Sequence, residues 1–263
     1  MIKPIFITIL LLLCISYAIC YIFQRQFIYL PSTETPRQED FNAMDMTQVT
    51  LTTEDSLKLL AWYKTAKPHQ PTLLFLHGNA GHIGYRMPLI RQFIQAGLGI
   101  LLLEYRGYGS NPGSPSEQGL YQDGRAAMQF LLDQGVTANQ IVLYGESLGT
   151  GVATKLASEY PVRCVVLQSP FTSMTHLAHY HYPWLILKSW DKFDSLSRMN
   201  QINAPLLVIH GKLDTIVPFT QGLEIYKQAN QPKSLMTLDK FGHNDLWSAP
   251  GFVDRIVQFI NSL

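Results

Sequence analysis

Short, continuous apolar runs recur along this 263-residue chain, and they constrain its fold more than any other feature. Continuous apolarity, in contrast to strict alternation, is typical of strands that are covered on both faces, so it indicates a mainly parallel sheet. Gly, Pro or polar residues bound each run. The runs are TLLFL (72–76), GILLL (99–103), IVLYG (141–145), CVVLQ (164–168), PLLVIH (205–210) and SLMTL (234–238).

Amphipathic helical segments separate these strands, and a hairpin precedes them. The stretches 47–53 and 57–64 alternate like strands and are joined by a short polar turn, which predicts an antiparallel hairpin. Eight strands with interleaved helices predict one doubly wound α/β domain over residues 47–263. Ser114 to Glu117 predicts a capped helix start with Pro115 as the first helical residue. The expected helices lie near 86–96, 115–134, 148–159, 220–230 and 250–262.

The N-terminus differs from the rest of the chain. Residues 4–23 carry no charge and 17 of the 20 are apolar, and twenty helical residues span about 30 Å, the thickness of the bilayer hydrocarbon. Residues 1–24 are therefore expected to form a single-pass transmembrane signal anchor. A cleaved signal peptide cut near Ala18 is the alternative, but the apolar run continues beyond it. The charges that flank the span leave its orientation undecided, and residues 25–46 are expected to form a tether.

Charge and cysteine content exclude some classes of function. The formal net charge is +1, from 20 Lys and Arg against 19 Asp and Glu, so no basic field indicates a nucleic-acid partner. The three cysteines cannot form a disulfide framework. Cys14 and Cys20 would lie roughly 9 Å apart along a helix, too far to bridge, and Cys164 falls in a predicted buried strand.

The segment Gly145–Gly149 (GESLG) follows a predicted strand and opens a predicted helix. A sharp turn between strand and helix exposes the hydroxyl of its central residue, and flanking glycines let the two elements approach closely. Ser147 is therefore the candidate nucleophile. The alternative is a glycine-rich turn in which this serine only caps the helix.

A serine hydroxyl needs a base and an acid that orients the base. His243 and Asp214 each follow the carboxyl end of a predicted parallel strand, the edge to which Ser147 also points. The order Ser147, Asp214, His243 is the order of the α/β-hydrolase triad. Asp239 and Asp245 are closer to His243 in sequence and remain rival acids.

The segment His77–Gly81 (HGNAG) follows another predicted strand and could supply backbone donors for negative charge. In acyl transfer the N–H after the nucleophile, here Leu148, acts with an N–H of this early loop, for which Asn79 is the candidate. His77 is expected to orient the loop rather than act as a second base.

These motifs resemble the α/β-hydrolase superfamily and, within it, the membrane-anchored alpha/beta hydrolase domain-containing proteins. The resemblance covers residues 47–263 and implies a serine hydrolase that acts through Ser147, Asp214 and His243 without a metal or organic cofactor. Glu104 departs from the pattern, since relatives usually carry Asp before Tyr-Arg-Gly, and this is expected to affect a structural contact. The matching segments are HGNAG, EYRGYGSNPGSPSEQGL (104–120), GESLG, SPFTS (169–173), HGKLDTIVP (210–218) and FGH (241–243).

A long connection at about 171–204 is rich in aromatic residues and is expected to form a cap over the strand ends. Phe171, Tyr182 and Trp184 are the candidate substrate-binding residues, and an acyl or lipid-like substrate would suit such a surface. The alternative is that these side chains only pack the cap onto the domain. Three histidines between 176 and 181 lack a carboxylate or cysteine at ligand spacing, so no metal site is expected.

The sequence thus predicts a membrane-anchored serine hydrolase that cleaves carboxylic ester or thioester bonds. A serine peptidase with the same triad is one alternative, and a membrane-tethered binding protein without catalysis is another. A dehalogenase would need Asp in place of Ser147.

Overall fold

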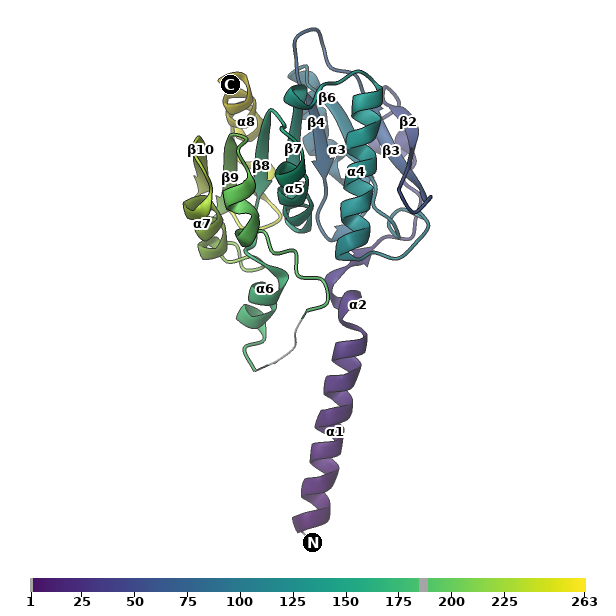
Figure 1. Ribbon diagram of the computed structural model, residues 1–263, viewed down its shortest axis with the longest axis vertical. Coiled ribbons are helices and arrows are strands. Elements are labelled where there is room, and N and C mark those ends of the chain that lie inside the picture. Colours follow the sequence, from purple (N-terminus) through teal and green to yellow (C-terminus); the bar gives the residue numbers. More distant parts are fainter. Residues whose placement is uncertain (1, 185–188) are drawn as a thin grey trace.

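The computed structural model describes the backbone of residues 2–184 and 189–263; within it, the side chains at positions 2–4, 6 and 13 lie outside the described residues. At its centre is an eight-stranded sheet with the strand order β10-β9-β8-β7-β4-β6-β3-β2 (Figure 1). The strands are β2 (Thr47–Thr52), β3 (Lys58–Lys64), β4 (Thr72–Leu76), β6 (Gly99–Leu103), β7 (Ile141–Glu146), β8 (Cys164–Gln168), β9 (Leu206–Gly211) and β10 (Lys233–Leu238).

The pairing of these strands confirms the predicted sheet. β2 and β3 form the expected antiparallel hairpin, and β3 also runs antiparallel to β6. The other pairs, from β6 through β4, β7, β8 and β9 to β10, are parallel. Every residue of β4, β6 and β8 is buried, as expected for strands that helices cover on both faces.

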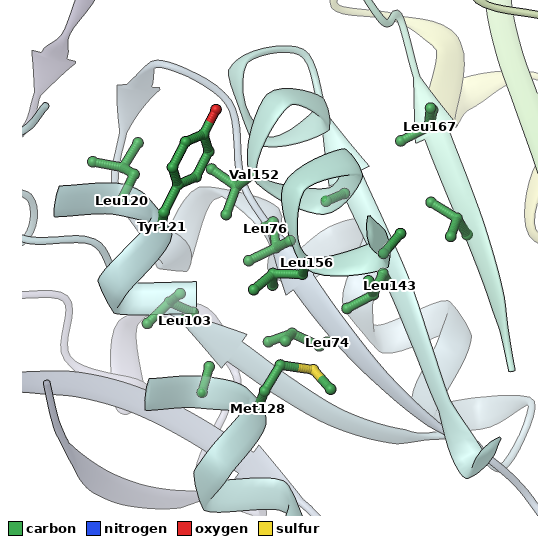
Figure 2. Close-up of a cluster of buried hydrophobic side chains, with 14 of the residues drawn as sticks. Leu74, Leu76, Leu103, Leu120, Tyr121, Met128, Leu143, Val152, Leu156 and Leu167 are labelled. Atoms are coloured by element: carbon green, nitrogen blue, oxygen red, sulfur yellow. The ribbon is translucent and has the colours of Figure 1, made fainter. Parts of the chain in front are cut away.

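Helices cover both faces of the sheet and build two apolar cores. One core joins the sheet to α4, α5 and α7. Figure 2 shows Leu156 of α5 on the side of Leu143 of β7, and Val152 of α5 on the side of Tyr121 of α4. The other core joins the opposite face to α3 and α8. These helices confirm the predicted ones, and each end lies within two residues of its prediction. Their bounds are α3 (Met87–Gln95), α4 (Glu117–Asp133), α5 (Leu148–Glu159), α7 (Phe219–Gln228) and α8 (Phe252–Asn261).

The start of α4 differs from the prediction. The helix begins at Glu117 rather than Pro115, and the side chain of Ser116 caps it by accepting from the Gly119 N–H at 3.1 Å. The Glu117 N–H donates to the carboxylate of Asp191 at 3.0 Å. A negative charge beside free N–H groups stabilises a helix start. The predicted start was two residues early because Ser116, and not Ser114, caps the helix. Asp191, 74 residues away, supplies a further partner for the first N–H of the helix.

The N-terminal residues form helix α1 (Ile2–Ile22), which projects from the domain (Figure 1). Among the fully described residues, no helix combines the length and the apolar character needed to cross a membrane. Positions 4, 6 and 13 of the predicted span 4–23 fall on side chains outside the described residues.

The predicted tether at 25–46 contains ordered elements. Helix α2 (Gln24–Ile28) leads into strand β1 (Leu30–Pro31), which pairs in parallel with β5 (Ala80–Gly81). A short 3₁₀ helix, η1, follows at Gln38–Phe41. This part of the chain therefore packs on the domain next to the loop that follows β4.

The cap predicted at 171–204 contains helix α6 (Met174–His181), and it lies on the same side of the domain as α1 (Figure 1). Ser173 caps α6 by accepting from the His176 N–H at 3.1 Å. The apolar residues at 185–187, which supported the prediction of a cap, lie outside the described residues.

Candidate active site

Ser147 lies in the turn between β7 and α5. Its backbone angles, φ 49° and ψ −113°, fall in a sparsely populated region, so surrounding structure must hold the turn in place. A Cβ atom on Gly145 would lie 2.7 Å from the Gly149 carbonyl oxygen, and one on Gly149 would lie 1.9 Å from the Leu76 carbonyl oxygen. Both glycines of the motif are therefore required by a close approach of backbone to backbone.

The structure brings His243 and Asp214 to Ser147. The His243 ring lies with Nε2 3.0 Å from Ser147 Oγ and with Nδ1 2.7 Å from Asp214 Oδ2. With the ring proton on Nδ1, His243 donates to the carboxylate and accepts the serine hydroxyl proton. The three residues come from loops after β7, β9 and β10, at the carboxyl edge of the sheet. This arrangement can deprotonate the hydroxyl as it attacks.

Asp214 is buried and well supplied with donors. Its Oδ1 accepts from the backbone N–H groups of Ile216 and Val217 at 2.9 and 2.7 Å. Burial by itself would raise the pKa of Asp214, but hydrogen bonds with His210, His243 and the Val217 amide outweigh it and hold this pKa well below its ordinary value. The carboxylate therefore stays ionised beside the imidazole at neutral pH.

The rival acids lie elsewhere. Asp239 forms an exposed ion pair with Lys212 at 2.8 Å. Asp245 accepts from the Gly242 N–H at 2.7 Å and so shapes the loop that carries the histidine. Of the three aspartates considered from sequence, Asp214 is the one that contacts the imidazole of His243.

The loop that follows β4 lies over the serine. Asn79 and Leu148, the residues predicted to supply oxyanion donors, line the same cavity as Ser147. The Asn79 carbonyl oxygen accepts from the Tyr108 hydroxyl at 2.9 Å and from the Leu30 N–H at 2.9 Å. The Asn79 side chain donates to the Ile28 carbonyl at 3.0 Å. Three hydrogen bonds thus determine how this residue is oriented.

His77 and Glu104 support this loop from inside. His77 is fully buried, with Nδ1 2.7 Å from the Gly78 carbonyl and Nε2 3.1 Å from a Glu104 carboxylate oxygen. The other oxygen of Glu104 accepts from the Ile83 N–H at 2.9 Å. Both residues therefore hold the loop, and neither contacts Ser147.

Sequence reasoning missed an ion pair beside the nucleophile. Arg86 donates to both carboxylate oxygens of Glu146 at 3.1 Å and to the Ala80 carbonyl at 2.8 Å. Burial by itself would raise the pKa of Glu146, but the charge and hydrogen bonds of Arg86, together with the nearby His77 and His243, outweigh burial and lower this pKa. Glu146 immediately precedes Ser147 and Ala80 lies in the loop that follows β4, so Arg86 joins the turn of Ser147 to that loop. The GESLG motif contained the carboxylate, but nothing local indicated its partner.

An apolar cavity of about 400 Å³ opens beside Ser147. Phe171, Tyr182 and Trp184, the predicted substrate-binding residues, all line it. Residues from the N-terminal part of the chain, which sequence reasoning had assigned to an anchor and a tether, line it as well. They are Cys20, Gln24, Phe27 and Ile28.

Comparisons with known proteins identify a family model and relatives that this chain resembles. A family model described as serine aminopeptidase, S33, matches residues 67–193. An uncharacterised protein of Mycobacterium tuberculosis is 39% identical over 244 residues, which are 90% of this chain and 87% of that protein. Alpha/beta hydrolase domain-containing protein 17C of Xenopus laevis is 35% identical over 193 residues, which are 72% of this chain and 61% of that protein.

The fold has solved counterparts. The structure of the esterase Pf2001 of Pyrococcus furiosus aligns with a TM-score of 0.72 at 22% identity, covering 89% of this chain and 98% of that one. At this identity the likeness concerns the fold. Taken with the relatives that match most of the sequence, it shows that this chain belongs to the α/β-hydrolase superfamily.

Proposed function

We propose that this chain is a membrane-anchored serine hydrolase that cleaves carboxylic ester or thioester bonds of acyl substrates through an acyl-enzyme. The observation that carries the proposal is the hydrogen-bonded row Ser147–His243–Asp214 at the edge of an apolar cavity. A nucleophile, a base within hydrogen-bond reach and an acid that orients the base are the parts that acyl transfer needs.

In the proposed mechanism His243 removes the proton from Ser147 as the hydroxyl attacks the carbonyl carbon. The N–H groups of Asn79 and Leu148 stabilise the oxyanion, and Asp214 stabilises the protonated imidazole. His243 then protonates the leaving alcohol or thiol, which departs. Water attacks the acyl-enzyme by the same route and releases the acid, with the proton returned to the serine.

The cavity favours an acyl group over a polar one. Its wall includes Phe27, Met174, Leu177 and Trp184, and its volume is in the range of small-molecule sites. Each methylene that leaves water for such a wall contributes about 0.8 kcal/mol. Longer acyl chains should therefore bind more tightly until the cavity is filled.

The membrane anchor is the second part of the proposal. The span 4–23 carries no charge, and the described side chains of Ile5, Leu11 and Ile15 are more than half exposed on a helix that leaves the domain. A surface this apolar on a projecting helix would be costly in water and stable in lipid. The proposed anchor would hold the cavity close to acyl chains in the bilayer.

Membrane attachment predicts a simple fractionation result. The full chain is expected to stay in the pellet after carbonate extraction of membranes. Replacing both Leu11 and Ile15 by Arg should release it, since each central Arg costs about 2.5–3.5 kcal/mol of insertion free energy. The matched variant with Ala at both positions should remain in the pellet. Release of the unmodified full chain into the supernatant, to the same extent as the Arg variant, would contradict the anchor.

Substrate preference is tested with purified protein and a graded series of p-nitrophenyl esters, acyl thioesters and aminoacyl anilides. We expect kcat/KM to rise at least about tenfold from acetyl to octanoyl ester, because added methylenes become buried in the cavity. The family model described as serine aminopeptidase makes a peptidase the second candidate. Turnover of aminoacyl anilides above that of all esters would favour it, and turnover of acetyl ester alone would contradict a long acyl substrate.

A further inference from the structure

The segment Gln24–Pro31, here called the N-terminal clamp, joins α1 to the domain and packs between the oxyanion loop and the cap. It consists of α2, Tyr29 and strand β1. The side chains of Gln24 and Tyr29 are buried, so the clamp is part of the folded domain. Its contacts on the two sides are of different kinds.

On the loop side the clamp contacts Asn79 with its backbone. The Leu30 N–H donates to the Asn79 carbonyl at 2.9 Å, and the Ile28 carbonyl accepts from the Asn79 side chain at 3.0 Å. The register of β1 on β5 places Leu30 opposite Ala80, next to Asn79. These bonds hold the Asn79 side chain and the peptide unit that follows Asn79. The Asn79 N–H lies on the preceding peptide unit, whose Gly78 carbonyl is 2.7 Å from His77 Nδ1, so the clamp and His77 hold the two units on either side of the Asn79 Cα.

On the cap side the clamp is held by Asp191, which is 2% exposed. Arg25 donates to both of its carboxylate oxygens, at 2.8 and 3.1 Å, and the Tyr29 hydroxyl donates at 3.0 Å. The side-chain oxygen of Gln24 accepts from the backbone N–H of Trp190 at 2.7 Å. A bidentate pair to a buried carboxylate specifies direction as well as distance, so these bonds restrict the position of the clamp on the cap.

We infer that the N-terminal clamp is a positioning element of the active site, which holds the Asn79 N–H in the orientation that stabilises the oxyanion. The inference rests on the proposed acyl-transfer function. Oxyanion donors act only if they are aimed in advance at the position where charge develops, and misplacement by 1 Å can cost about 100-fold in rate. The segment between anchor and domain would then act in catalysis in addition to connecting the two.

Leu30 offers a clean test, because its N–H contacts the loop while its side chain is 53% exposed. Leu30→Pro removes the donor, and Tyr29, at φ −106° and ψ 123°, already has the conformation of a residue before proline. Leu30→Ala keeps the N–H and is the matched control. With the best ester substrate, kcat of L30P should fall about 10- to 100-fold relative to L30A, with KM changed less than about threefold.

A second readout separates positioning from general damage. An alkylboronic acid forms a tetrahedral adduct with the serine and needs the oxyanion donors, whereas the carboxylic acid product does not resemble the transition state. L30P should weaken boronic acid inhibition by about the factor lost in kcat and leave product inhibition nearly unchanged. Equal kcat and equal boronic acid affinity in L30P and L30A would overturn the inference.

Tyr108→Phe keeps the test decisive if near-ultraviolet circular dichroism shows that L30P does not fold. It removes the other donor to the same Asn79 carbonyl and leaves the ring in place. A fall in kcat and in boronic acid affinity by the same factor supports positioning through Asn79, and no change in either overturns it. Failure of the proposed function would look different, because wild-type protein would then turn over no ester at all.

Discussion

Ser147→Ala is expected to lower kcat toward the best ester by about 10⁴- to 10⁶-fold, with the protein still folded. The substitution removes the hydroxyl that attacks the carbonyl. His243 and Asp214 act only through this hydroxyl and cannot take its place as the nucleophile. Labelling by a fluorophosphonate probe, which reacts with an activated serine, should disappear in the same variant. Both are measured on purified protein, with thermal unfolding to check the fold.

Ser110→Ala is the matched control for this variant. Ser110 also has a positive φ, 66°, and its hydroxyl is exposed and bound to the Thr33 carbonyl, but it does not line the cavity. The same substitution at another residue of positive φ should leave turnover and labelling unchanged. Equal labelling of wild type and Ser147→Ala would contradict the assignment of the nucleophile.

Asp214→Asn should have the second largest effect, a fall in kcat of about 10⁴-fold with little change in KM. The amide can no longer hold the Nδ1 proton in the required tautomer, and it cannot stabilise the imidazolium that forms in the transition state. The hydrogen bonds that keep the pKa of Asp214 below its ordinary value show how strongly this site favours a charged carboxylate. Steady-state kinetics over the ester series measure the effect.

Asp239→Asn makes the same chemical change in the sequence-level rival. Its side chain is 69% exposed and pairs with Lys212 on the surface. Turnover by this variant should equal that of wild type within about twofold, since surface pairs contribute little to stability. A loss in Asp239→Asn as large as that in Asp214→Asn would mean that the acid has been assigned wrongly.

The motif residues that carry the proposed chemistry were predictable because their signals are local. A sharp turn from a strand into a helix favours glycine at its flanks. Gly145 and Gly149 both approach backbone atoms too closely to carry a Cβ atom. Asp214 was preferred over Asp245 because it follows a parallel strand, and parallel strands end at one edge of a sheet. The structure places Asp214, and not its rivals, against His243.

Contacts between distant parts of the chain were not predictable in this way. The carboxylate of Asp191 accepts from the first N–H of α4, 74 residues away, and no local pattern shows this contact. Arg86 and Glu146 are 60 residues apart, and nothing in either local sequence indicates that they pair beside the nucleophile. The N-terminal residues that line the cavity lie in segments whose composition predicted only an anchor and a tether. They are Cys20, Gln24, Phe27 and Ile28.

The sequence by itself determined the strands, the helices, the sharp turn at Ser147 and the edge of the sheet at which Asp214 and His243 would meet it. These follow from hydrophobic periodicity and from steric limits on the backbone, which act over a few neighbouring residues. Only the tertiary structure decided that Gln24–Pro31 packs on Asn79 and Asp191, across separations of 51 and 166 residues. Such contacts depend on how completed elements pack together, and a buried carboxylate or carbonyl is satisfied by whichever donor that packing brings near.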